Sequence, residues 1–181
     1  MLRCLLGERK SGKSVFVENQ VKLIDKKALY IATLPDLCRY QETIMAHQKR
    51  RLSSWNCVEL FKMSIEEMLT YPYNNYQNVI LDNLSYYLLF QLYYNEDEFI
   101  RQCDNRVFSF INEIAKNDNT TVYIIDTPIY QDVLEEDDKT GIIRRLFTQI
   151  LDKAAVIERF YDNAVICCMS KEEGKQYLFH T

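Results

Sequence analysis

The chain has 181 residues, of which 48% are hydrophobic and 27% charged, proportions that favour a folded globular protein over a disordered one. That length fits one domain spanning residues 1–181. The net charge of −4 at pH 7 argues against a nucleic-acid partner, because phosphate backbones are bound by broad basic surfaces.

No apolar run approaches the roughly 20 residues that a helix needs to cross a bilayer. The stretch before Gly7 is also too short for a signal peptide. We therefore expect a cytoplasmic protein without a membrane partner. The six cysteines agree with this expectation. They are spread through apolar stretches without any CxxC pair, and we interpret them as reduced residues of the core.

Strands and helices are predicted to alternate along the chain. The expected strands are Leu2–Leu6, Ala28–Ala32, Asn78–Leu81, Thr120–Ile125 and Ala164–Met169, with a further edge strand at Lys175–Phe179. The first expected helix runs from the end of a loop at Gly7–Ser14 to about Leu23. Further helices are expected over Tyr40–Leu52, Leu84–Tyr94, Asp97–Lys116 and Thr140–Tyr161. This alternation predicts an α/β fold whose mostly parallel sheet carries helices on both faces.

Tyrosine is unusually frequent, with 13 residues in the chain. Several cluster in an Asn-rich loop at 71–76 and along the hydrophobic helix expected at Leu84–Tyr94. Because tyrosine combines apolar area with a polar tip, this clustering favours either an oligomer contact or a half-buried helix face.

The segment Gly7–Ser14, GERKSGKS, fits the phosphate-loop pattern G-x-x-x-x-G-K-[ST] at every position. An apolar strand precedes it and an amphipathic helix follows it, so its backbone N–H groups and the helix N-terminus would face a bound anion. Lys13 would contact the β- and γ-phosphates, and the Ser14 hydroxyl would bind Mg²⁺. The expected nucleotide-binding residues are Gly7, Glu8, Arg9, Lys10, Ser11, Gly12, Lys13 and Ser14.

A phosphate loop needs an acidic partner for the metal or for the substrate hydroxyl. Asp82 closes the apolar run Val79–Leu81 and should lie at the carboxyl end of a parallel strand, near the phosphates. The alternative is that Asp82 caps the helix that begins near Leu84, a task that Asn83 could share. Asp126 ends another strand in the same way, but a turn role is equally compatible with Pro128 close behind it.

Further along, Leu29–Thr33 reads LYIAT, His47 is followed by Arg51 and Trp55, and Ile80–Ser85 reads ILDNLS. With the phosphate loop, this order and spacing resembles the bifunctional adenosylcobinamide kinase/adenosylcobinamide-phosphate guanylyltransferase family over about the first half of the chain. The resemblance implies a RecA-like P-loop fold and a homo-oligomer, in the family a homotrimer. It also implies a cobalamin-biosynthesis enzyme that phosphorylates cobinamide and then transfers GMP from GTP through a guanylyl-histidine.

The resemblance also implies roles for single residues. His47 falls on the guanylylated histidine, while Asp82 and Lys13 complete the catalytic set. Ser14 and Asp82 would hold Mg²⁺, with GTP or ATP as the nucleotide substrate. Arg51, together with its basic neighbours, would neutralise phosphate charge. Without the resemblance, a histidine among basic residues on a helix is typical of a protein surface.

The second half of the chain departs from the family's usual motifs, for example at Asp126–Tyr130. Two alternatives therefore stand beside the leading hypothesis. One is a diverged P-loop kinase that acts on another small alcohol, and the other is a nucleotide-binding protein without catalysis.

Overall fold

The structure is a computed structural model of the chain. It describes residues 1–8, 10–24, 27–63, 67, 70–88, 119–127, 141, 148, 151–152, 154, 156–161, 164–169 and 176–179. The predicted helix Asp97–Lys116 lies outside these residues, as does the second half of the helix predicted at Leu84–Tyr94.

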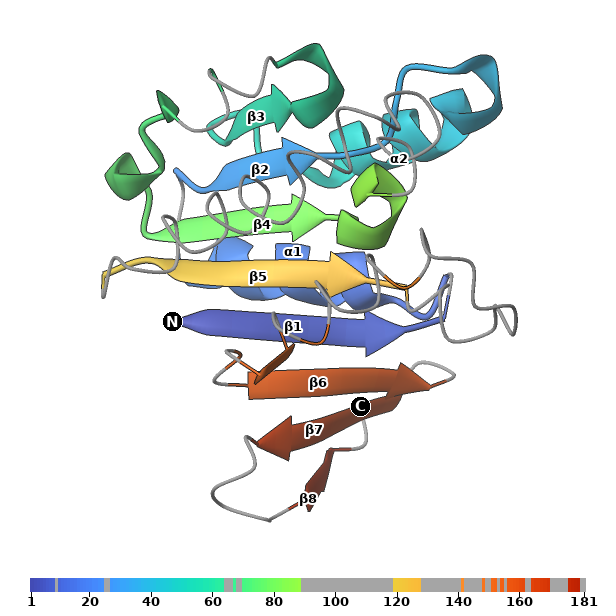
Figure 1. Ribbon diagram of the computed structural model, residues 1–181, viewed down its shortest axis with the longest axis vertical. Helices are drawn as coiled ribbons and strands as arrows, with labels where there is room; N and C mark the ends of the chain where they lie inside the picture. Colours follow the sequence, from blue (N-terminus) through green and yellow to red (C-terminus); the bar gives the residue numbers. More distant parts are fainter. Residues whose placement is uncertain are drawn as a thin grey trace.

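The described strands form one sheet in the order β3-β2-β4-β5-β1-β6-β7-β8 (Figure 1). The strands are β1 Leu2–Gly7, β2 Leu29–Ala32, β3 Asn56–Glu59, β4 Asn78–Asp82, β5 Thr121–Asp126, β6 Val156–Tyr161, β7 Ala164–Met169 and β8 Gln176–Phe179. Neighbouring strands from β3 to β6 run parallel, whereas β7 and β8 add an antiparallel edge. The predicted α/β fold with a mostly parallel sheet is confirmed.

The described helices are α1 Lys13–Ile24 and α2 Gln41–Arg50, and residues 84–88 after β4 are also helical. Short 3-10 turns lie at Cys38–Tyr40, Leu60–Lys62 and Tyr73–Asn75. Helix α1 lies behind β1, β4 and β5 in Figure 1, and α2 lies beyond the carboxyl end of β2. No helix among these described residues is long and apolar enough to span a membrane.

The core has two parts because successive side chains of a strand point to opposite faces of the sheet. On one face, Leu5, Tyr30 and Ile80 pack with Val17 and Val21 of α1. The strand residues that alternate with them pack on the other face, together with tyrosines from the turn before β4 and from the residues after it: Leu2, Cys4, Leu6, Leu29, Ile31, Val79, Leu81, Val122, Ile124, Tyr73 and Tyr87. Burial on both faces explains why these strands are continuous apolar runs.

The structure differs from the sequence-based expectations at three points. The helix predicted over Thr140–Tyr161 cannot extend to its end, because Val156–Tyr161 is strand β6, paired with β1 and β7. Strand β3 at Asn56–Glu59 was not predicted. Cys4 is buried as expected, but Cys38 and Cys57 are exposed, since one lies in a 3-10 turn and the other on the edge strand β3.

Candidate functional site

The phosphate loop connects β1 to α1 at the carboxyl edge of the sheet, as its sequence predicts. Two residues of the described part of the loop have positive φ, Lys10 at 67° and Gly12 at 88°. Gly7 instead ends β1, so the turn relies on Lys10 and on the second glycine. Arg9 lies outside the described residues.

The Lys13 side chain is folded back over the loop. Its Nζ donates to the carbonyl oxygens of Gly7 and Glu8, both at 2.6 Å, and lies 3.3 Å from Ser11 Oγ. Burial lowers the pKa of Lys13, while the negative charges of Asp82 and Asp126 oppose that shift. The ammonium group is therefore held at the centre of the loop by partners that a phosphate oxygen could replace.

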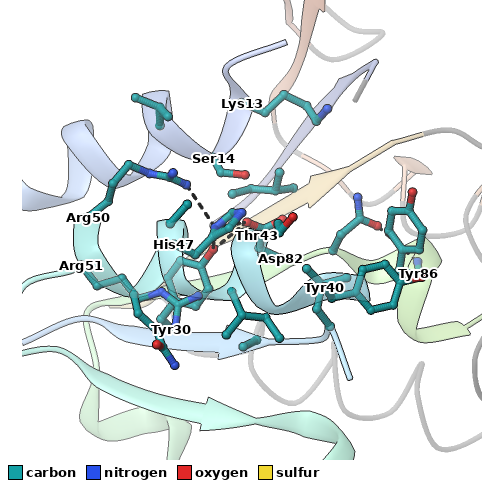
Figure 2. Close-up of a pocket in the computed structure, with 18 of the residues that line it drawn as sticks. Lys13, Ser14, Tyr30, Tyr40, Thr43, His47, Arg50, Arg51, Asp82 and Tyr86 are labelled. Carbon is teal, nitrogen blue, oxygen red and sulfur yellow. Dashed lines mark hydrogen bonds and ion pairs between the residues drawn. The ribbon is translucent and has the colours of Figure 1, made fainter. Parts of the chain in front are cut away.

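A cavity of about 610 Å³ opens between this loop and helix α2 (Figure 2). It is lined by the loop residues from Lys10 to Ser14 on one side, and on the other by much of α2 with His47. Asp82 at the end of β4 and Arg51 just after α2 also line it. One cavity thus contains the phosphate loop, the acidic residue and the histidine that the sequence singled out.

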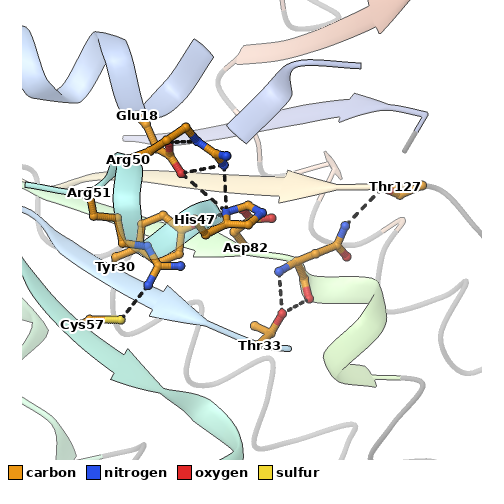
Figure 3. A network of polar contacts seen from close by, with 10 residues as sticks. Glu18, Tyr30, Thr33, His47, Arg50, Arg51, Cys57, Asp82 and Thr127 are labelled. Carbon is orange, nitrogen blue, oxygen red and sulfur yellow. Dashed lines mark hydrogen bonds and ion pairs between the residues drawn. The ribbon is translucent and has the colours of Figure 1, made fainter. Parts of the chain in front are cut away.

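A short hydrogen-bonded chain joins Asp82 to His47 through Tyr30 (Figure 3). The Tyr30 hydroxyl donates to Asp82 Oδ2 at 2.6 Å and lies 3.1 Å from His47 Nδ1. Tyr30 is fully buried under the cavity. Burial, followed by the charge of Asp82, raises the pKa of Tyr30 well above its usual value, so the phenol keeps its proton.

A second carboxylate approaches the same imidazole from α1. Glu18 is fully buried and accepts from Arg50 Nε at 2.7 Å, while its Oε1 lies 3.5 Å from His47 Nδ1. Burial acts to raise the pKa of Glu18, yet hydrogen bonds from His47 and Arg50 outweigh it and the pKa lies below its usual value. Arg50 Nη2 also lies 3.2 Å from His47 Nδ1. The ring is therefore set between two carboxylates and a guanidinium.

Arg51 has a different environment from Arg50. Its guanidinium stacks on the Tyr30 ring, with the central carbon 3.6 Å from the ring centroid, and its Nη1 lies 3.0 Å from Cys57 Sγ. The Nε atom of Arg51 is buried and has no hydrogen-bond partner among the residues that the structure describes. This stacking holds the Arg51 guanidinium at the wall of the cavity, against the tyrosine that contacts His47.

The capping role considered for Asp82 is filled by its neighbours. Asn83 Oδ1 accepts from the backbone N–H of Tyr86 at 3.3 Å. Asp126 is fully buried and accepts from the backbone N–H of Ser85 at 3.1 Å, from Ser85 Oγ at 2.6 Å and from its own neighbour Thr127 at 2.8 Å. Asp82 is left to contact Tyr30 and to face the cavity.

Sequence reasoning did not single out Glu18 or Tyr30 as parts of this site. A signal existed for Glu18, which is a charged residue beside Val17 on the buried face of an amphipathic helix. For Tyr30 the signal was weaker, because a tyrosine in a buried strand is ordinary core unless its hydroxyl partner is known.

The sequence profile of the family described as cobinamide kinase / cobinamide phosphate guanyltransferase matches residues 4–166, which is most of the chain. The chain belongs to this family. The match extends past the first half on which the resemblance of the sequence was based, and it includes the strands β5 and β6. No curated protein sequence matches the chain significantly.

Among solved structures, the chain is similar to one described as the crystal structure of the RadB recombinase, with a TM-score of 0.59 and 16% sequence identity. The similarity covers 98% of this chain and 86% of the recombinase. At that identity it shows the fold, and it confirms the RecA-like P-loop architecture.

Proposed function

We propose that this member of the family is a nucleotide-dependent adenosylcobinamide kinase and adenosylcobinamide-phosphate guanylyltransferase, and that GMP passes through a guanylyl-histidine at His47. The observation that carries the proposal is the shared cavity, where His47 and the phosphate loop face the same space. Family membership supports the pair of activities, and the geometry supports the assignment of residues.

For the kinase step, Lys13 would neutralise the β- and γ-phosphates of the nucleotide, and Asp82 would accept the proton of the cobinamide hydroxyl while the hydroxyl oxygen attacks the γ-phosphorus. The bond from that phosphorus to the bridging oxygen breaks, and the nucleoside diphosphate leaves with the electron pair. The Ser14 hydroxyl and the Asp82 carboxylate are oxygen donors that fit Mg²⁺. No group of three or more His, Cys, Asp or Glu side chains that could hold a metal ion occurs in the described part of the chain. Phosphate oxygens and water are the further ligands that Mg²⁺ would take. When bound, the ion would neutralise phosphate charge.

For the guanylyl step, the lone pair of an imidazole nitrogen of His47 attacks the α-phosphorus of GTP. The bond from that phosphorus to the bridging oxygen breaks, and pyrophosphate leaves with the electron pair. A phosphate oxygen of adenosylcobinamide phosphate then attacks the phosphorus, which yields the GDP-linked cobinamide and frees the imidazole. Arg50 and Arg51 lie close enough to stabilise the negative charge that builds up on the transferring group.

Products made from GTP and adenosylcobinamide test this proposal by separating the two steps. Wild-type protein should form the phosphate first and the GDP-linked product afterwards, as followed by liquid chromatography and mass spectrometry. His47→Ala should stop at the phosphate, because only the second step uses the imidazole. Lys13→Ala should lower both products by about 100-fold, since it removes the charge that binds the triphosphate.

The matched controls are His180→Ala, which alters the only other histidine, and Lys22→Ala, a lysine further along α1. Both controls should retain the two products. If folded wild-type protein forms neither product, the proposal is wrong. Turnover of ATP with a different alcohol would then favour the diverged kinase.

A further inference from the structure

Resting on this proposed function, the geometry points to Tyr30 as the positioning residue that sets the reactive tautomer of His47. Neutral imidazole carries one proton, and only the other nitrogen has a lone pair for attack. The contacts that the described residues make with the His47 ring all reach Nδ1. Which atom carries the proton therefore decides whether Nε2 is available.

The hydrogen-bond chain allows one assignment. The Asp82 carboxylate can only accept, so the single proton of Tyr30 is directed to Oδ2 at 2.6 Å. Tyr30 Oη must then accept from the group 3.1 Å away on its other side, which is His47 Nδ1. The proton of the neutral ring lies on Nδ1, and the lone pair lies on Nε2.

Arg50 is the competing neighbour of Nδ1, because its guanidinium can only donate. Its Nε and Nη2 are both directed to Glu18, at 2.7 and 3.4 Å. The approach of Nη2 to Nδ1 at 3.2 Å is then a contact between two donors, which the carboxylates of Glu18 and Asp82 make tolerable. Without the Tyr30 oxygen, Arg50 Nη2 at 3.2 Å would be the polar atom nearest to Nδ1, ahead of the Glu18 and Asp82 oxygens at 3.5 and 3.6 Å, and a donor at the shortest distance favours the opposite tautomer.

The same arrangement assists the guanylyl step. When Nε2 forms its bond to the α-phosphorus and pyrophosphate leaves, the ring keeps its Nδ1 proton and becomes cationic. Glu18 Oε1 at 3.5 Å and Asp82 Oδ2 at 3.6 Å lie beside that nitrogen and stabilise the positive charge. Tyr30 thus links the acidic residue of the kinase step to the nucleophile of the guanylyl step.

Nitrogen-15 NMR of the imidazole rings tests this assignment directly, at alkaline pH where imidazoles are neutral. With His180→Gln as the background, only His47 contributes signals. The wild-type ring should show the proton on Nδ1. In Tyr30→Phe the proton should move to Nε2, and formation of the GMP adduct should slow by about tenfold or more while GTP affinity stays within about twofold. Tyr76→Phe removes a tyrosine hydroxyl that contacts Asn56 and does not line the cavity, and it should change neither property.

A wild-type His47 with its proton on Nε2 overturns the inference, and so does a folded Tyr30→Phe variant with the wild-type tautomer and rate. The wild-type spectrum alone decides the matter if Tyr30→Phe does not fold. The spectrum is recorded without GTP, so it does not depend on the proposed function. If that function is wrong, the wild-type protein would still carry the proton of His47 on Nδ1 but would never gain GMP.

Discussion

Asp126 is the described carboxyl group with the most unusual protonation. It is fully buried at the end of β5 and accepts hydrogen bonds from Ser85 and Thr127. Burial raises its pKa from 3.8 to about 7, although those hydrogen bonds and the charge of Lys13 act in the opposite direction. The folded protein therefore holds this proton more tightly than the unfolded chain does.

The stability of the protein should depend on pH through Asp126. Below pH 3.8 the group is protonated in both states, and its stabilising contribution is lost as pH rises through about 7. Relative to Asp126→Asn, which stays neutral, the free energy of unfolding of the wild type should fall by up to about 4 kcal/mol between pH 4 and pH 8. Urea denaturation across that range measures the difference.

The comparison variant is Asp36→Asn, which removes one carboxyl group from an exposed position and leaves Asp126 in place. Parallel stability curves for wild type and Asp126→Asn would show that the buried carboxyl group has an ordinary pKa.

At the scale of elements, α2 is the helix that positions His47, and it has no fully buried residue of its own. An ion pair joins its Arg50 to the buried Glu18 of α1. This ion pair therefore connects the helix that carries His47 to the helix that follows the phosphate loop.

Removing that ion pair should weaken both stability and catalysis. Arg50→Ala leaves a buried carboxylate without its cation, which should lower the free energy of unfolding by about 1–3 kcal/mol, less than for a fully buried pair because Arg50 is 32% exposed. Formation of the GMP adduct should also slow, since α2 loses its anchor. Thermal denaturation and adduct kinetics measure the two effects. Lys49→Ala, on the same helix but exposed, should behave as wild type, and equal stability of both variants would contradict the anchoring role.

The sequence was informative about elements wherever an apolar run ended in a polar signal. The apolar run Val79–Leu81 ends in Asp82, and this pattern predicted both strand β4 and the place of Asp82 at the carboxyl edge of the sheet. The phosphate-loop motif did the same for β1 and the loop that follows it. The prediction for Val156–Tyr161 was wrong because Glu158 and Arg159 interrupt the apolar residues and continue a helical pattern. Only the pairing of this segment with β1 and β7 makes it a strand. Such pairing is non-local, so a single sequence does not reveal it.

At the scale of the whole molecule, the candidate site is assembled by the sheet order. Strands β2 and β4 are neighbours, so Tyr30 and Asp82 lie close together. Strand β1 brings the phosphate loop to the same edge of the sheet. The loop, Asp82 and His47 could be predicted as separate motifs. Their meeting in one cavity, with Glu18 and Tyr30 between them, depends on contacts between residues far apart in the chain.

The proposed guanylylation of His47 in this cavity is the step on which the second activity depends. Intact-protein mass spectrometry after incubation with GTP and Mg²⁺ tests it most directly, with peptide mapping to locate the modified residue. The wild-type protein should gain the mass of one GMP on His47, and this added mass should be absent from His47→Ala and present in His180→Ala. Wild-type protein that binds GTP tightly and never gains this mass, or that carries it on another residue, would contradict the account.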